Sequence, residues 1–326
     1  MTLIALLGGC TSTSVTEKYQ DKRNDIINVK DKVIEFETGN VLIGSVSRLY
    51  MSNKCLLIAD HKSVDKQIHI FNKNDFSYLT SIGNFGEGPE EITVMGCLAI
   101  DEAHHQLYVS DHAKQKIFSY DMDSVMVDSL YKPQVKTAMN ETLFPSEYQY
   151  INDTLSIAVL IKPTSTSTFN QFLGRWNMNT GEMIPMKYTH PDIQKKRITF
   201  AASEKAGIYV ECYTRHDLMT ICSLDGELLY NIYGPDWDGG NGNKLQSFGT
   251  VMIGNDKIFV SYCGEDYARD SFPTKILVFD LEGNYLKTLE TGYKISDCCY
   301  DSFNNRIILS LNDVVQFAYL DIDGII

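Results

Sequence analysis

Several features that would assign the chain to a familiar class are missing from its 326 residues. No run of about 18 apolar residues occurs, so the sequence holds no candidate for a membrane-spanning helix. Basic residues are scarce, with 29 Lys and Arg against 42 Asp and Glu. The resulting net charge of −13 would repel the phosphates of a nucleic acid. We therefore expect no nucleic acid among the partners.

Motifs that carry common chemistries are also absent. None of the eight cysteines belongs to a Cys-x-x-Cys pair, which argues against a zinc site and a thioredoxin-type centre. The sequence has no Gly-x-Ser-x-Gly nucleophile elbow, no phosphate-binding loop and no His-Glu-x-x-His helix. We predict no cofactor and no bound metal.

Seven of the cysteines follow residue 10, and most of them lie in apolar strand segments. A free cysteine in such a segment packs as a small hydrophobic residue. Cys298 and Cys299 are adjacent, so their side chains point to opposite faces of a strand and are badly placed to bridge each other. We expect few or no disulfides.

What the sequence does contain is a repeat. A short apolar strand recurs six times, at a spacing of about 50 residues. The six strands centre on Ile58, Val109, Ala158, Val210, Val260 and Leu309. Strand-forming residues that return at a fixed period of this length are typical of a β-propeller with one blade per repeat.

A second set of markers gives the same number of blades. Each marked strand is followed by another that ends in a turn rich in Asn, Asp and Gly, residues that tolerate the positive φ of tight hairpins. These turns cover residues 72–75, 121–124, 177–181, 224–226, 281–284 and 321–324. The sequence therefore predicts an all-β fold, a six-bladed β-propeller with four-stranded blades a to d.

The two ends of the chain complete one blade between them. Only Ile325 and Ile326 follow the sixth turn, whereas residues 26–36 read as a surplus strand before the first complete blade. We expect this N-terminal strand to complete the last blade, because that closes the ring and hides two strand edges. The single propeller domain then spans residues 26–326.

The first ten residues have a different character. Leu7-Gly8-Gly9-Cys10 ends a short apolar run and precedes the polar residues 11–14, although no Lys or Arg stands before it. The motif resembles the lipobox of a bacterial lipoprotein signal peptide, whose cysteine becomes acylated. The resemblance implies a signal remnant over residues 1–10, lipidation of Cys10 and a polar tether over residues 11–25. The alternative is an apolar N-terminus without function.

One blade carries a more specific pattern. A glycine-rich turn at residues 82–92 is followed by Leu98-Ala99-Ile100-Asp101, by Leu107-Tyr108-Val109-Ser110-Asp111 and by Lys116-Ile117-Phe118. This order resembles the NHL repeat. Across its whole length the chain is similar to the TolB-like six-bladed propeller lipoproteins. That resemblance implies the fold and the lipid anchor, and it implies little chemistry.

The topology of a propeller indicates which face binds ligands. The d–a and b–c connections emerge on one face, here named the loop face, and the a–b and c–d turns emerge on the opposite face. Loops on a rigid scaffold commonly carry function. The candidate ligand-binding residues on the loop face are Asp60, His61, Asp111, His112, Arg215, His216, Asp217, Trp237, Asp266 and Arg269.

Structural roles compete with ligand binding at these positions. Asp60 and Asp111 stand at strand ends, where Asp commonly accepts hydrogen bonds from the neighbouring backbone, and NHL-type repeats keep an Asp there. Trp237 is suited to stack on a sugar or anchor a peptide where it is exposed, and otherwise packs as core. The structural role is favoured for Asp60 and Asp111, whereas both interpretations of Trp237 remain open.

Catalysis is the alternative function. Six-bladed lactonases hold a divalent cation with several inward oxygen ligands. The strands expected to line the channel contain two carboxylates, Glu147 and Asp297, in blades that face each other across the ring. They are badly placed to share one ion. His104 and His105 fall in an a–b turn on the opposite face and read as exposed surface.

The sequence thus favours a non-catalytic, lipid-anchored module that binds a protein or glycan ligand through the loop face. A lactonase-like propeller hydrolase or lyase, with its site at the channel mouth, is the alternative. Acylation at Cys10 would anchor the protein to a membrane of the bacterial cell envelope without embedding it, either in the periplasm or at the cell surface.

Overall fold

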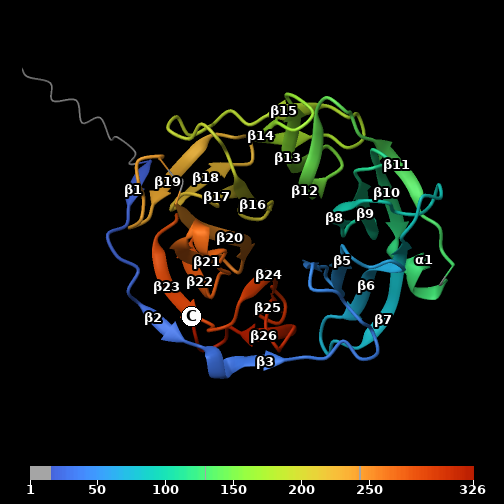
Figure 1. The fold of residues 1–326 in the computed structure, drawn as a ribbon, viewed down its shortest axis with the longest axis horizontal. Coiled ribbons are helices and arrows are strands. Elements are labelled where there is room, and N and C mark those ends of the chain that lie inside the picture. Colours follow the sequence, from blue (N-terminus) through green and yellow to red (C-terminus); the bar gives the residue numbers. More distant parts are fainter. Residues whose placement is uncertain (1–15, 129, 242–243) are drawn as a thin grey trace, which may run out of the picture.

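The structure is a computed structural model that describes residues 16–128, 130–241 and 244–326. Six sheets stand in a ring around a central channel (Figure 1). Each sheet contains the four antiparallel strands of one blade, and two of the sheets carry an additional fifth strand. The predicted six-bladed β-propeller with four-stranded blades is confirmed.

The strands of each blade run from the channel outward. Strands a, the innermost, are β4 (Ser47–Met51), β8 (Met95–Asp101), β12 (Phe144–Asn152), β16 (Ile198–Ser203), β20 (Leu245–Gly254) and β24 (Ile295–Asp301). Strands b are β5 (Cys55–Asp60), β9 (Gln106–Asp111), β13 (Leu155–Pro163), β17 (Ile208–Tyr213), β21 (Lys257–Asp266) and β25 (Arg306–Leu311). Strands c are β6 (Lys66–Asn72), β10 (Lys116–Asp121), β14 (Phe169–Trp176), β18 (Leu218–Ser223), β22 (Lys275–Asp280) and β26 (Phe317–Asp321). Strands d, the outermost of each blade, are β7 (Tyr78–Asn84), β11 (Gln134–Ala138), β15 (Met183–Pro185), β19 (Leu228–Tyr233), β23 (Tyr285–Glu290) and β3 (Val33–Glu35).

The apolar core lies between neighbouring blades. Each strand b holds one of the six apolar centres of the repeat, and all six of these residues are 0% exposed. Six clusters of buried apolar side chains each join one blade to the next around the ring. Both faces of a middle strand are therefore covered, which explains why strands b are apolar throughout and do not alternate.

Helices are few and short among the described residues. The helix α1 (Met122–Val127) lies in the c–d connection of the second blade, where the Asp121 carboxylate caps it by accepting from the Ser124 amide. The single turns η1 (Lys30–Lys32) and η2 (Tyr267–Arg269) are 3₁₀-helical. No helix in the described ranges is long and apolar enough to cross a membrane.

The ring is closed by the N-terminal part of the chain, as predicted. Strand β3 pairs antiparallel with β26 and supplies the outermost strand of the sixth blade. The closing strand is shorter than the expected segment 26–36. The first residues of the expected segment form a separate strand, β2 (Ile26–Asn28), which pairs in parallel with β23 of the fifth blade. The turn η1 lies between β2 and β3 and changes the direction of the chain.

The structure differs from the sequence-based expectation over residues 16–25, the described part of the predicted tether. Strand β1 (Glu17–Tyr19) pairs in parallel with β19 of the fourth blade. Residues 16–28, here named the strap, thus follow the outer rim of the ring across two blades (Figure 1). The outer edges of β19 and β23 carry backbone N–H and C=O groups that have no partner within the blade. A polar segment can hydrogen-bond to these groups in place of water. Residues 1–15, with the predicted lipidation site Cys10, lie outside the described residues.

Every cysteine in the described ranges is free and buried. Burial raises the pKa of these thiols, which is the behaviour of structural rather than reactive cysteines. These cysteines are buried, as expected for free cysteines in apolar strand segments.

Candidate functional site

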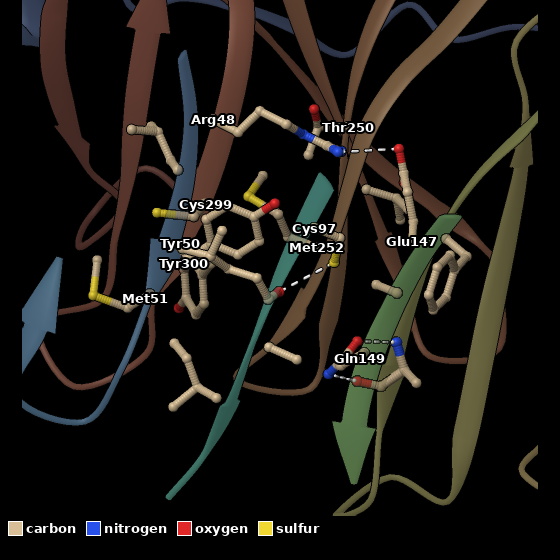
Figure 2. A pocket seen from close by; sticks show the side chains of 18 of the residues that line it. Arg48, Tyr50, Met51, Cys97, Glu147, Gln149, Thr250, Met252, Cys299 and Tyr300 are labelled. Atoms are coloured by element: carbon tan, nitrogen blue, oxygen red, sulfur yellow. Dashed lines mark hydrogen bonds and ion pairs between the residues drawn. The ribbon is translucent and has the colours of Figure 1, made fainter. Parts of the chain in front are cut away.

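The central channel forms a cavity of about 450 Å³, lined by residues of all six innermost strands. Figure 2 shows its polar and apolar parts. The polar part contains Arg48, Glu147, Thr250 and Asp297, and the remaining lining is dominated by Tyr, Met, Ile, Phe and Cys side chains. Arg48 stands near the start of β4, where the chain enters from a d–a connection, and this places the polar part toward the loop face.

One ion pair crosses the channel. The Arg48 guanidinium, from the first blade, donates to the Glu147 carboxylate of the third blade, with 3.0 Å between Nη1 and Oε1 (Figure 2). The two side chains are 39% and 38% exposed, so solvent in the channel reaches both. A pair of this exposure contributes little to stability and remains available to other partners.

Asp297 is held differently from Glu147. Its carboxylate accepts from the Leu49 amide at 2.8 Å and from the Thr250 hydroxyl at 2.7 Å. Burial raises the pKa of Asp297, although the nearby Arg48 and these hydrogen bonds act in the opposite direction. Glu147 and Asp297, the two carboxylates that the sequence places on the inner strands, therefore have separate hydrogen-bond partners.

The predicted loop-face aspartates are buried and tie the loops to the blades. The Asp60 carboxylate accepts from the amides of Gly44 and Lys62, and the Asp111 carboxylate accepts from four backbone amides of residues 93–94 and 113–114. Asp217, 0% exposed, forms an ion pair of 2.8 Å with Arg23 of the strap. All three aspartates bind protein groups, and none offers a free face to a ligand.

The predicted histidines lie beneath the loop-face surface. His61 donates through Nδ1 to the Met95 carbonyl at 3.3 Å, and His112 packs against Phe144 with 6.0 Å between ring centroids. His216 is 7% exposed and lies beside Trp237, with 5.9 Å between ring centroids. Burial lowers the pKa of all three imidazoles. They are neutral packing residues at pH 7.

Trp237 is packed rather than presented. Its ring contacts Tyr233 at 5.0 Å and His190 at 5.7 Å between centroids, in addition to His216. The side chain is partly buried as a member of a cluster that joins the third and fourth blades. Stacking of a sugar on this tryptophan would require that cluster to open.

Three predicted residues do reach the surface together. Arg215 lies over the ring of Tyr267, with its guanidinium carbon 3.3 Å from the ring centroid. Asp266 caps η2, which Tyr267 begins, and Arg269 ends η2 and pairs with Glu265 at 2.8 Å. These residues form one patch on the b–c connections of the fourth and fifth blades. The ten predicted residues are thus divided among several places and do not form a single site.

The sequence analysis missed the apolar part of the loop face. Nine large apolar side chains on or next to its connections are at least 37% exposed. They are Leu42, Val46, Val64, Phe85, Val94, Phe169, Tyr267, Phe272 and Val314. Among the described residues the opposite face carries five by the same criterion, Tyr78, Met126, Val127, Leu130 and Phe303, and Met126, Val127 and Leu130 belong to one connection. Counting apolar residues within the predicted loops would have revealed the difference.

One group on the opposite face resembles a metal site in composition. Ligand atoms of Asp101, His104 and Asp153 lie within 4.8 Å of one another. The Asp101 carboxylate binds the backbone amide and the side chain of His104. The sixth blade contains the same turn, in which the Asp301 carboxylate binds the backbone amide and the side chain of Asn304. The sixth blade thus has Asn where the second blade has His, and Asn is a poorer metal ligand than His. The same turn forms with either residue, which indicates that its role is structural.

Comparison with known proteins extends the fold assignment. A family model described as a 6-bladed β-propeller matches residues 11–171. No curated protein matches the chain.

Similar solved structures include two from Bacteroides. A candidate exported protein of Bacteroides fragilis is 13% identical, with a TM-score of 0.60 over 94% of this chain and 98% of that one. A member of the DUF4221 family from Bacteroides vulgatus is 11% identical, with a TM-score of 0.59 over 92% and 98%. The β-propeller domain of Cps50 (Swd1) from Myceliophteria thermophila is 9% identical, with a TM-score of 0.54 over 86% and 98%. At these identities the likeness concerns the fold alone.

Proposed function

We propose that this chain is a lipid-anchored propeller of the bacterial cell envelope that binds a protein ligand through its loop face. The observation that carries the proposal is the set of nine exposed apolar side chains on that face. Apolar and aromatic residues beside arginines are the composition of protein-binding surfaces. The stacked pair of Arg215 and Tyr267 is of this kind.

A protein ligand is favoured over a glycan by the state of Trp237. Sugars bind proteins through exposed aromatic faces, whereas Trp237 is engaged by His190, His216 and Tyr233. The exposed aromatic residues Phe85, Phe169, Tyr267 and Phe272 share the loop face with five exposed aliphatic side chains. This mixture suits an apolar protein surface better than a hydroxyl-rich one.

The proposal of a lipid anchor rests on the lipobox-like residues 7–10 and on the path of the strap. The strap follows the outer rim of the ring beside β19 and β23 (Figure 1). An anchor reached from the rim does not obstruct recognition. The exported class given to the Bacteroides fragilis neighbour and the TolB-like resemblance both agree with an envelope location.

Photocrosslinking in the native cells tests this function. A photoreactive benzoylphenylalanine is placed at Leu42, Phe85 or Tyr267 on the loop face and, as matched controls, at Val127, Leu130 or Phe303 on the opposite face. We expect the three loop-face positions to capture the same partner protein and the three control positions to capture none.

Two results would contradict the proposal. The first is capture from the opposite face alone, and the second is the absence of any captured protein together with enrichment of a polysaccharide. The variant Cys10→Ala separates anchoring from recognition, since we expect it to leave the membrane fraction while a solubilised sample still captures the partner.

A further inference from the structure

The channel contains a group of polar side chains that the proposed binding of a protein at the loop face does not involve. Its polar part is built from side chains of four blades, namely Arg48, Glu147, Thr250 and Asp297. Ion pairs that only fasten blades together would be expected between neighbouring blades. Arg48 and Glu147 instead belong to the first and third blades and meet inside the channel (Figure 2).

Irregularities in the innermost strands accompany the polar side chains. The register of β12 shifts between Pro145 and Glu147, and that of β24 shifts between Ile295 and Asp297. The register of β20 shifts between Phe248 and Val251, so that Thr250 falls inside the irregular segment. A β-bulge reverses the pleat locally and redirects side chains, and bulges are frequent beside binding sites. Three of these register shifts thus coincide with three of the four polar groups, and a fourth, in β8 between Met95 and Leu98, carries none of them.

Arg48 has more hydrogen-bond donors than its surroundings use. A guanidinium carries five N–H groups. Within the described part of the chain, one of them donates to Glu147 and the others have no acceptor. The oxygens of Asp297 already accept from Leu49 and Thr250. Arg48 is also the only cation among the described residues that line the cavity, and at 39% exposure its remaining donors are open to the solvent of the channel and to an incoming acceptor.

The rest of the cavity is suited to an apolar group. Its lining includes Met51, Met252, Ile100, Ile253, Phe200 and Tyr300, with Glu102 and Gln149 as polar members. The volume of about 450 Å³ is in the range of small-molecule sites, which run from roughly 300 to 1,000 Å³. Apolar walls with a few placed polar groups are the usual composition of such sites.

We propose that the channel binds a small carboxylate with an apolar or aromatic body, independently of the loop-face partner. The ligand carboxylate occupies the free donors of Arg48, because the planar guanidinium fork matches the two oxygens of a carboxylate. Its body lies against the Met, Ile and Phe side chains. Glu147 is the internal competitor for Arg48, and it turns toward the solvent of the channel when the ligand binds.

Saturation-transfer difference NMR tests the proposal with three probes of one shape. These are 3-phenylpropionate, 3-phenylpropan-1-ol and 3-phenylpropylamine, titrated into the full chain and its variants. We expect the wild-type protein to bind the carboxylate more tightly than the alcohol and the amine, because only the carboxylate satisfies Arg48.

Two substitutions should act in opposite directions. Arg48→Met should weaken binding of 3-phenylpropionate about tenfold or more, as loss of a charge-assisted pair does. Glu147→Gln removes the competing charge and should tighten it. Arg175→Ala, on an exposed pair outside the residues that line the channel, serves as the control and should leave binding unchanged.

The reverse pattern would overturn the proposal. A channel for cations would bind 3-phenylpropylamine best, would lose it in Glu147→Gln and would gain affinity in Arg48→Met. Failure of the wild-type protein to bind 3-phenylpropionate overturns it as well. If Arg48→Met does not fold by circular dichroism, Arg48→Lys replaces it. That variant keeps the charge and loses the fork, and wild-type affinity in it would count against the proposal.

Discussion

At the scale of single residues, the most consequential contact is the buried pair of Arg23 and Asp217. Their side chains are 7% and 0% exposed, with 2.8 Å between Nη1 and Oδ1. The guanidinium also lies within 6 Å of the rings of Phe248, Tyr262 and Phe279. Gly234 makes room for the carboxylate, since a Cβ there would lie 2.1 Å from it. The pair fastens the strap into the seam between the fourth and fifth blades.

Removing one partner of this pair should be costly. We expect Arg23→Ala to lower the free energy of unfolding by about 3–5 kcal/mol, because the buried Asp217 carboxylate loses its ion-pair partner. The double variant Arg23→Met with Asp217→Asn should recover more than half of that loss, since it removes both charges. Urea unfolding, followed by circular dichroism, measures the free energy of unfolding of the wild-type protein and of each variant.

The exposed pair of Arg269 and Glu265 is the matched control. Arg269→Ala should cost less than about 1 kcal/mol, as exposed ion pairs do. Equal effects of Arg23→Ala and Arg269→Ala would contradict the assignment of Arg23 as a fastening residue.

The role of Arg23 could not be predicted from the sequence, whereas that of Asp111 could. Asp111 accepts from amides within 18 residues of it, and such local capping leaves a recognisable pattern at a strand end. Arg23 meets Asp217 across 194 residues, and no local pattern marks either partner. Arg48 was also missed because only carboxylates were sought on the inner strands. The signal that identifies Arg48 in the sequence is a charged residue within an otherwise apolar strand of the channel.

At the scale of elements, the strap and the closing strand β3 have separate roles. Strands β1 and β2 add fifth strands in parallel to blades that already have four. Strand β3, in contrast, supplies the fourth strand of the sixth blade, which would otherwise expose the edge of β26. The strap therefore reinforces a complete ring, and β3 completes it.

Two N-terminal truncations separate these roles. A chain that begins at Lys30 loses the strap and keeps β3, and we expect it to remain a folded monomer with a lower Tm. A chain that begins at Glu37 also loses β3. We expect it to associate or aggregate, because it presents an unpaired edge. Circular dichroism and light scattering record the two outcomes, and a soluble, monomeric Glu37 chain would show that ring closure does not depend on β3.

The sequence predicted the strongly apolar elements and missed the weakly patterned ones. Strands b are buried on both faces, so each is an apolar run that its composition reveals. Strand β1 has three residues, of which Tyr19 is 69% exposed, and it forms only because the edge of β19 is free. Such pairing depends on tertiary context, and the segment reads as a polar tether when taken alone.

At the scale of the whole molecule, the features on which the proposed recognition rests lie toward one end of the ring. The loop face carries the nine exposed apolar side chains, and the polar part of the channel lies toward the same face. The strap follows the outer rim beside β19 and β23, and its Arg23 pairs with Asp217 of the fourth blade. The proposed function therefore assigns ligand binding to one end of the ring and attachment to its outer rim.

Hydrogen–deuterium exchange of the propeller, alone and bound to the captured partner, tests this central claim most directly. Exchange slows where a partner covers backbone amides. The account predicts slower exchange in the loop-face connections, residues 85–94 and 267–274 in particular, with unchanged exchange in the a–b turns of the opposite face. Protection confined to the a–b and c–d turns, or to the outer edges of the blades, would contradict it.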